Sequence, residues 1–252
     1  MFQNKKSLII FITGGDPCIE TTEKLIPEMV EAGADLIEIG IPFSDPVAEG
    51  PVIQAASERA LANGATTDKL LEMVARLRRK VSIPLLFMTY LNPIYVYGKE
   101  RFLSACRDCG INGIIVPDMP FEEKGELSEE CAKFDIALIS IVAPTSSERV
   151  AMIAKEAEGF LYCVSSLGVT GMRSEIKAGI ETIIAQAKKC TDVPCAIGFG
   201  ISNAEQAGKM ANIADGVIVG SAVVKIIEKY GNDCVEPVKE FVKSMKEAIV
   251  RK

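Results

Sequence analysis

The chain has 252 residues, 48% of them hydrophobic, which is enough to bury a substantial core and predicts one domain over residues 1–252. Its net charge of −6, with 28 basic and 34 acidic residues mixed along the chain, leaves no basic stripe for nucleic acid. No apolar run approaches the roughly 20 residues that span a membrane, no signal peptide is recognisable, and eight scattered cysteines suit a reducing compartment, so a cytoplasmic location is expected.

Short apolar strands alternate with amphipathic helical segments along the chain. Eight strands are expected, at residues 8–13, 36–41, 84–89, 113–117, 137–142, 160–165, 195–199 and 216–219. Helices are expected at residues 20–32, 52–63, 67–80, 100–109, 122–133, 147–157, 174–189, 204–211, 222–229 and 237–251. The strands lack clean alternation, which indicates that both faces are covered, and the strict strand–helix succession predicts a parallel sheet.

The number of strand–helix units points to a closed barrel. Eight units in about 250 residues match a (β/α)8 TIM barrel, a parallel eight-stranded barrel with outer helices. An open doubly wound sheet is the alternative, and its dinucleotide-binding version is disfavoured because no GxGxxG follows the first strand. In a barrel, the residues that follow the strands form the active site.

Glu38 is the only charge in the second strand, residues 36–41. Strand side chains alternate, so Leu36, Glu38 and Gly40 share one face while three isoleucines on the other face pack under helices. An apolar setting is expected to raise the pKa of Glu38 toward the range useful for proton transfer at neutral pH. An internal salt bridge of Glu38 is the alternative. The loop that follows, rich in proline and glycine, carries a second candidate, Glu49.

The residue types that are missing from the chain narrow the range of possible catalytic mechanisms. The chain has no histidine, which excludes Ser-His-Asp and Cys-His catalysis and histidine-based metal sites. No lysine stands at the functional end of a strand, which disfavours an imine-forming aldolase. Cys106 and Cys109 form a CxxC on an expected helix without a second pair, so helix packing is favoured there and no metal is expected. Acid–base chemistry by carboxylates on a small phosphorylated substrate remains.

Two glycine-containing segments, at residues 198–202 and 220–221, follow the last two strands. Barrels commonly hold phosphate at these positions with backbone N–H groups at a helix N-terminus, although simple turns are the alternative. The segment 165–175 combines small and polar residues with two glycines, which suits a mobile lid, with a plain surface turn as the alternative.

Several of these segments together resemble one enzyme family. EIGIPFSDPVAEGP at 38–51, with TGGDP near the start, GVTG at 168–171, GFGIS at 198–202 and GSAVVKII at 220–227, resembles the tryptophan synthase alpha subunit from about residue 8 to the end. The resemblance implies a carbon–carbon lyase that cleaves indole-3-glycerol phosphate to indole and glyceraldehyde 3-phosphate by a retro-aldol reaction. The indole ring itself would then accept the electrons of the breaking bond.

The resemblance also implies roles for individual residues. Glu38 matches the catalytic acid/base, and Glu49 takes the place of a second carboxylate that the family normally supplies as aspartate in ADGP. A glutamate there keeps the charge but moves it by roughly 1.5 Å, and a misplacement of about 1 Å can cost about 10²-fold in rate. The positions matching the substrate-binding site are Phe11, Tyr90, Ile115, Asp118, Tyr162, Thr170 and Phe199. Those matching the phosphate cradle are Gly171, Gly200, Gly220 and Ser221. The aromatic residues among them could instead be ordinary barrel core.

Partners and cofactors follow from the same resemblance. The family works as an alpha2beta2 complex with a beta subunit that holds pyridoxal phosphate and takes up the indole, so no cofactor is expected in this chain. The loops after strands two and three would contact that partner, and docking could order the loop that carries Glu49. The alternatives are a weakly catalytic, phosphate-binding regulatory subunit, which the Asp-to-Glu exchange supports, and another phosphate-binding barrel enzyme such as an isomerase or epimerase.

Overall fold

A computed structural model describes residues 2, 6–164, 173–198 and 200–250. Its strands form one parallel sheet in the order β5-β4-β3-β2-β1-β9-β8-β7-β6. The strands are β1 (Ser7–Thr13), β2 (Leu36–Gly40), β3 (Leu85–Met88), β4 (Gly113–Ile115), β5 (Ala137–Ile139), β6 (Ile141–Val142), β7 (Leu161–Val164), β8 (Cys195–Gly198) and β9 (Gly216–Val219).

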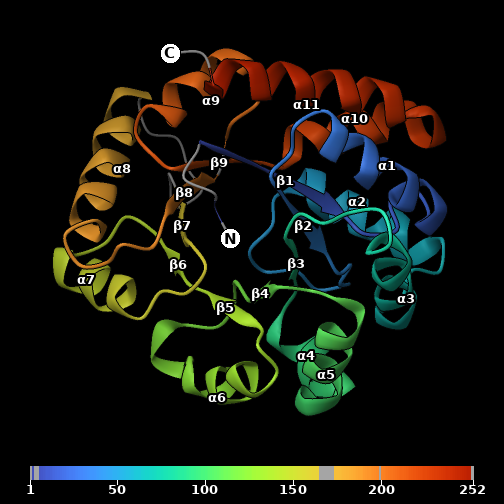
Figure 1. The fold of residues 1–252 in the computed structure, drawn as a ribbon, viewed down its shortest axis with the longest axis horizontal. Helices are drawn as coiled ribbons and strands as arrows, with labels where there is room; N and C mark the ends of the chain where they lie inside the picture. The colour runs from blue at the N-terminus through green and yellow to red at the C-terminus, as the bar shows by residue number, and fades with distance from the viewer. Residues whose placement is uncertain (1, 3–5, 165–172, 199, 251–252) are drawn as a thin grey trace.

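The sheet closes through the expected fifth strand. β5 and β6 stand at opposite ends of the strand order, yet only Ser140 separates them in the chain. β5 pairs with β4 and β6 pairs with β7, while the Tyr162 N–H donates to the Ser140 carbonyl at 2.9 Å. Residues 137–142 thus bend at Ser140 as they pass from one neighbouring strand to the other, and the ribbon curls into a barrel (Figure 1). The predicted (β/α)8 barrel is confirmed, and the open doubly wound alternative is wrong.

Helices surround this barrel on its outer side (Figure 1). They are α1 (Ile19–Glu31), α2 (Pro51–Ala62), α3 (Thr67–Leu77), α4 (Leu91–Tyr97), α5 (Lys99–Cys109), α6 (Gly125–Lys133), α7 (Ser147–Lys155), α8 (Arg173–Ala187), α9 (Ala204–Ala211), α10 (Ser221–Tyr230) and α11 (Val235–Val250), with short 3-10 turns η1 (Phe121–Glu123) and η2 (Gly231–Asp233). No helix among the residues that the structure describes is long and apolar enough to span a membrane.

Helix α4 is an element that the sequence pattern did not predict. Its sequence LNPIYVY places Asn92 and Pro93 in the first turn, where a proline needs no intrahelical hydrogen-bond partner. The cap comes from another strand end, because the Leu91 N–H donates to the Asp118 carboxylate at 3.0 Å. A pattern of local residues cannot show such a cap, so the segment resembles a turn in sequence.

Strand alternation separates the barrel interior from the layer under the helices. Leu36, Leu86 and Ile115 belong to an interior cluster, whereas Ile37 and Ile39 belong to the large cluster between strands and helices. This confirms the two predicted faces of the second strand. The interior cluster contains Ile9, Leu36, Leu86, Ile115, Ile139, Phe160, Ala196 and Ile218, with Tyr162 and Met88 packed against it.

The amino ends of the strands carry two surface hollows. One, of about 540 Å³, lies beside Phe2, Lys6 and Asp215, and the other, of about 600 Å³, lies beside Asn112 and Ala137. Phe2 stacks on Phe160 with ring centroids 5.5 Å apart and closes this end of the barrel. Barrel enzymes carry their chemistry at the opposite, carboxyl end.

Candidate active site

Glu38 points into the carboxyl-terminal half of the barrel. β2 lies between β1 and β3, and Glu38 pairs in register with Phe11 on one side and Leu86 on the other. The side chain is fully buried, and neither carboxylate oxygen has a hydrogen-bond partner among the described residues. The expected alternative, an internal salt bridge, is therefore absent from the part of the chain that the structure describes.

Burial alone decides the charge of Glu38. Removing the carboxylate from water without a compensating partner raises its pKa from 4.5 to about 8. The group is thus mainly protonated at pH 7, as a proton donor has to be. Its pKa is close enough to neutral pH for the group to give up and regain its proton. The predicted direction of the pKa shift is confirmed.

Two glycines make room for aromatic rings beside Glu38. A Cβ built on Gly40 would lie 2.8 Å from the Phe11 ring, and one built on Gly198 would lie 2.5 Å from the Tyr162 hydroxyl. Both contacts are shorter than side chains tolerate, so only glycine leaves room for the two rings at these places. Burial, and secondarily the charge of Glu38, raise the pKa of Tyr162 well above its ordinary value, which places this ring close to the carboxylate.

Phe11 also joins the barrel to two helices. It lies in a small cluster with Ala56 of α2 and Val224 of α10, and its Cβ lies 3.3 Å from the position that a Cβ on Gly220 would take. Phe11 is 4% exposed, so it contributes an apolar wall that is shielded from solvent at the end of the barrel. A flat aromatic substrate needs such a surface.

Glu49 is held at the end of the loop that follows β2. The Gln54 side-chain amide donates to the Glu49 carbonyl at 2.8 Å, and the Tyr90 hydroxyl accepts the Ala48 N–H at 3.2 Å. Burial raises the pKa of Glu49 to about 7, opposed by a hydrogen bond with the Tyr90 hydroxyl. One carboxylate oxygen, Oε2, is buried and has no hydrogen-bond partner in the part of the chain that the structure describes. Tyr90 therefore places the second carboxylate at the carboxyl end of the strands.

Asp118 holds the backbone beside Tyr90. Its carboxylate accepts the Leu91 N–H at the start of α4, one residue after Tyr90. It thereby holds the backbone that positions the Tyr90 ring. Ile115, expected to contact the substrate, lies fully buried in the interior cluster on β4.

The start of α10 lies near this site. Gly220 is its N-cap, Ser221 is its first residue, and the N-cap makes no side-chain hydrogen bond to the first turn in the described part of the chain. Helix α9 differs, because the Asn203 side chain accepts the Gln206 N–H of its first turn. Uncapped N–H groups and the positive end of a helix dipole suit an anion.

The remaining predicted positions divide into two groups. Gly200 has a φ of +76° and is exposed, with open space where a side chain would stand. Thr170, Gly171 and Phe199 lie outside the described residues, as does most of the segment expected to form a lid.

Thr13 is a candidate that the sequence reasoning overlooked. It follows Ile9 and Phe11 on the same face of β1, is 1% exposed, and its hydroxyl has no hydrogen-bond partner among the described residues. Such a buried hydroxyl at a strand's carboxyl end is available to a ligand. The signal was present in the alternation of the first strand.

The CxxC segment behaves as the sequence suggested. Cys106 and Cys109 are both buried on α5, and burial raises the pKa of both thiols above the ordinary range. Both belong to the core cluster under the helices. Within the described residues, no group of three or more His, Cys, Asp or Glu side chains could hold a metal ion.

Comparison with known proteins settles the family. A family model described as tryptophan synthase alpha chain matches residues 1–250. The tryptophan synthase alpha chain of Alkaliphilus metalliredigens (strain QYMF) is 48% identical over 246 residues, covering 97% of this chain and 92% of the relative. That of Thermoanaerobacter sp. (strain X514) is 47% identical, covering 98% of this chain and 95% of the relative. This chain belongs to the tryptophan synthase alpha chain family.

Solved structures of the family superpose closely. The tryptophan synthase alpha subunit from Legionella pneumophila str. Paris matches with a TM-score of 0.88 at 40% identity, covering 97% of this chain and 93% of that one. A structure of the tryptophan synthase a2b2 complex from Pyrococcus furiosus matches with a TM-score of 0.87 at 38% identity, covering 95% of this chain and 97% of that one. The expected tryptophan synthase family and barrel fold are confirmed.

Proposed function

We propose that this chain catalyses the tryptophan synthase alpha reaction, a lyase cleavage of indole-3-glycerol phosphate, with Glu38 as its acid and base. The observation that carries this assignment is the Glu38 carboxyl at the carboxyl end of the barrel, which is fully buried and has no hydrogen-bond partner among the described residues. A member of this family needs one group that can both donate and accept a proton, and burial gives Glu38 a pKa of about 8 for that purpose.

The proposed steps balance without a metal or an imine. The protonated Glu38 donates to C3 of the indole ring, which converts the ring into an iminium. The resulting carboxylate accepts the proton of the glycerol hydroxyl next to the ring. The carbon–carbon bond then breaks, its electrons pass to the indole nitrogen, and the hydroxyl oxygen becomes the carbonyl of glyceraldehyde 3-phosphate. Indole leaves with its aromatic system restored, and Glu38 is protonated again.

Glu49 is proposed to stabilise the positive charge that develops at the indole nitrogen. The longer side chain, in place of the family's usual aspartate, is accommodated by folding back against Tyr90, which hydrogen-bonds its carboxylate. A charged Glu49 acts electrostatically in a setting with little water.

Substrate binding is proposed to divide between an aromatic and an anionic end. The indole would lie among Phe11, Tyr90, Ile115, Tyr162 and Phe199. Thr170 and Asp118 would order the closed site, the latter through its hold on the backbone beside Tyr90. The phosphate would lie at Gly171, Gly200, Gly220 and Ser221, where the uncapped start of α10 provides backbone donors.

The proposed partner is a tryptophan synthase beta subunit in an alpha2beta2 complex, with pyridoxal phosphate held by the beta subunit and no cofactor in this chain. The Pyrococcus furiosus relative forms an a2b2 complex with mutual activation. In this chain, Val47 on the loop after β2 and Val96 on α4 are each 80% exposed. Apolar side chains so exposed on the segments that follow neighbouring strands suit a protein interface. Because Val47 and Glu49 share one loop, docking can order the second carboxylate.

Incubation with indole-3-glycerol phosphate tests the proposal. We expect indole release by the chain alone, faster release on adding a beta subunit, and none from Glu38→Gln, which should still bind glycerol 3-phosphate. The second candidate, a weakly catalytic regulatory subunit, is favoured only by the glutamate at position 49. It would bind glycerol 3-phosphate, release little indole, and still activate the beta subunit. Unchanged turnover on adding the beta subunit would contradict the proposed activation.

The chain is further proposed to act as one domain over residues 1–252 in the cytoplasm. Helix α11, near the C-terminus, packs against α1, α9 and β1, which joins both ends of the sequence in one core. All eight cysteines are free thiols, as expected of a protein in a reducing compartment.

A further inference from the structure

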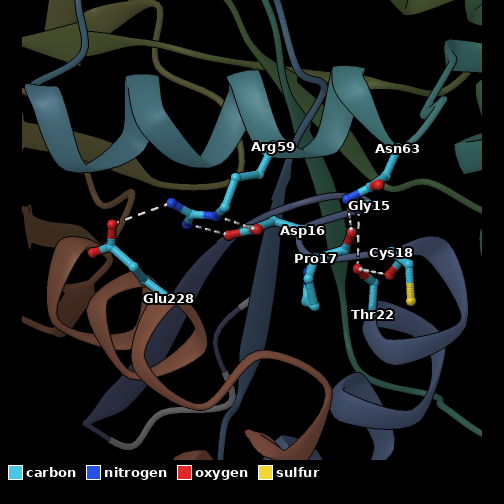
Figure 2. Close-up of polar contacts among 8 residues, drawn as sticks. All are labelled: Gly15, Asp16, Pro17, Cys18, Thr22, Arg59, Asn63 and Glu228. Carbon is cyan, nitrogen blue, oxygen red and sulfur yellow. Dashed lines mark hydrogen bonds and ion pairs between the residues drawn. The ribbon is translucent and has the colours of Figure 1, made fainter.

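Arg59 of α2 bridges two carboxylates from distant parts of the chain (Figure 2). Its guanidinium makes a bidentate contact with Asp16, through Nε at 2.9 Å and Nη2 at 2.8 Å. Its third nitrogen, Nη1, lies 3.3 Å from Glu228 of α10. The planar guanidinium alone among side chains can serve two carboxylates in this way.

Asp16 fixes one end of this network. Its side chain is fully buried in the loop that follows β1, so Arg59 is needed to compensate its charge. The loop itself is held firmly: the Gly15 N–H donates to Thr22 Oγ1 at 3.0 Å, and the Asn63 amide donates to the Pro17 carbonyl at 2.8 Å (Figure 2). The bidentate contact therefore ties α2 to a rigid part of the barrel rim.

The two helices that Arg59 joins both begin at the proposed active site. Helix α2 starts at Pro51, two residues after Glu49, and α10 starts at Ser221, next to Gly220. Ala56 of α2 and Val224 of α10 belong to one buried cluster with Phe11. The Arg59 network joins the same two helices nearer their other ends, so two separate contacts set how they lie relative to each other.

We propose that Arg59 is a positioning residue that fixes the placement of Glu49 relative to the phosphate-binding start of α10. This inference rests on the proposed function. The substrate spans both places, since its phosphate would lie at α10 and its indole nitrogen at Glu49. A fixed distance between these two places matters because a reaction slows by about 10²-fold when its reacting groups are about 1 Å out of place. Arg59 touches no substrate, and it acts through the two helices.

Conservative variants separate an effect of Arg59 on the geometry of the active site from an effect on the stability of the fold. Arg59→Lys keeps a positive charge beside Asp16, but an ammonium group cannot make the bidentate contact and reach Glu228 together. Glu228→Ala removes a half-exposed partner, and Glu228→Gln keeps an acceptor oxygen for Arg59. The matched control is Arg76→Lys, because Arg76 also joins two helices, α3 and α1, by donating from Nε and Nη2 to Glu23 Oε2 at 3.0 and 2.8 Å.

The measurements are kcat and KM for indole release and the inhibition constant of glycerol 3-phosphate. We expect Arg59→Lys to lower kcat by about 10-fold and Glu228→Ala by about 3-fold, with glycerol 3-phosphate inhibition within twofold of the parent chain. Glu228→Gln and Arg76→Lys should keep the parent kcat. When kcat is expressed per folded chain, with the folded fraction taken from circular dichroism, a selective loss of kcat is a result that mere destabilisation does not produce.

Each other outcome has a defined meaning. A folded Arg59→Lys chain with unchanged kcat, or a loss of glycerol 3-phosphate binding as large as the loss of kcat, would overturn the positioning role. If Arg59→Lys does not fold, Glu228→Ala decides by the same two criteria. A parent chain that releases no indole refutes the proposed function itself, which makes the two failures distinguishable.

Discussion

Replacing Glu38 by glutamine is expected to abolish indole release and, at the same time, to stabilise the folded chain at neutral pH. The parent carboxyl is fully buried, has no hydrogen-bond partner within the described ranges, and its pKa rises from 4.5 to about 8 on folding. Between these two values the folded chain holds a proton that the unfolded chain has released. The stability of the parent therefore falls as the pH rises through this window.

The size of the effect follows from the pKa difference. One pKa unit is worth about 1.4 kcal/mol, so the buried carboxyl costs about 3 kcal/mol at pH 7, about 4 at pH 8 and about 1 at pH 5. Glutamine has nearly the same shape as the protonated acid and does not titrate. The difference in the free energy of unfolding between Glu38→Gln and the parent should therefore grow with pH by these amounts.

Urea denaturation followed by far-ultraviolet circular dichroism at pH 5, 7 and 8 measures this difference. The control is Glu129→Gln on α6, which makes the same substitution at an exposed side chain. A pH-independent difference for Glu38→Gln would refute the reasoning, because it would mean that the carboxyl is not desolvated. Retained indole release by this variant would separately refute its role as the acid and base.

Three further predictions concern the same site. Glu49→Asp should raise kcat above that of the parent, since the shorter side chain matches the family's usual carboxylate, while Glu49→Ala should lower it by about 10²-fold. The pH profile of kcat/KM should be bell-shaped: activity falls below about pH 7 as Glu49 loses its charge, and above about pH 8 as Glu38 loses its proton. Gly198→Ala should lower kcat by about 10-fold, because the added Cβ would meet the Tyr162 ring at 2.5 Å and push it from its place beside Glu38.

The controls for these predictions are specific. Full activity of Glu49→Ala would make that residue a surface charge only. The Glu38→Gln chain cannot serve in the pH profile, so Glu49→Gln is the useful comparison, and its profile should lack the limb near pH 7. For Gly198→Ala, the companion is Gly179→Ala on α8, where a Cβ meets nothing within 4 Å and activity should be unchanged.

Much of the barrel could be predicted from local patterns. The alternation of Leu36, Glu38 and Gly40 against three isoleucines placed the carboxylate on the interior face, since strand side chains have a period of two. The local patterns failed where a residue distant in the sequence determines the local structure. The fifth strand divides at Ser140 because the barrel closes there, and α4 exists because Asp118 caps it. Neither cause lies within the segment concerned.

The sequence by itself determined the strand–helix order, the family resemblance and the kind of chemistry, because each depends on residue types and short spacings. Tertiary structure alone decided how the groups act. The raised pKa of Glu38 comes from complete removal from water, and Glu49 meets Tyr90 only in the folded chain. Arg59 finds Asp16 and Glu228 at separations of 43 and 169 residues. Desolvation and long-range pairing depend on how the whole barrel packs, and no local pattern encodes them.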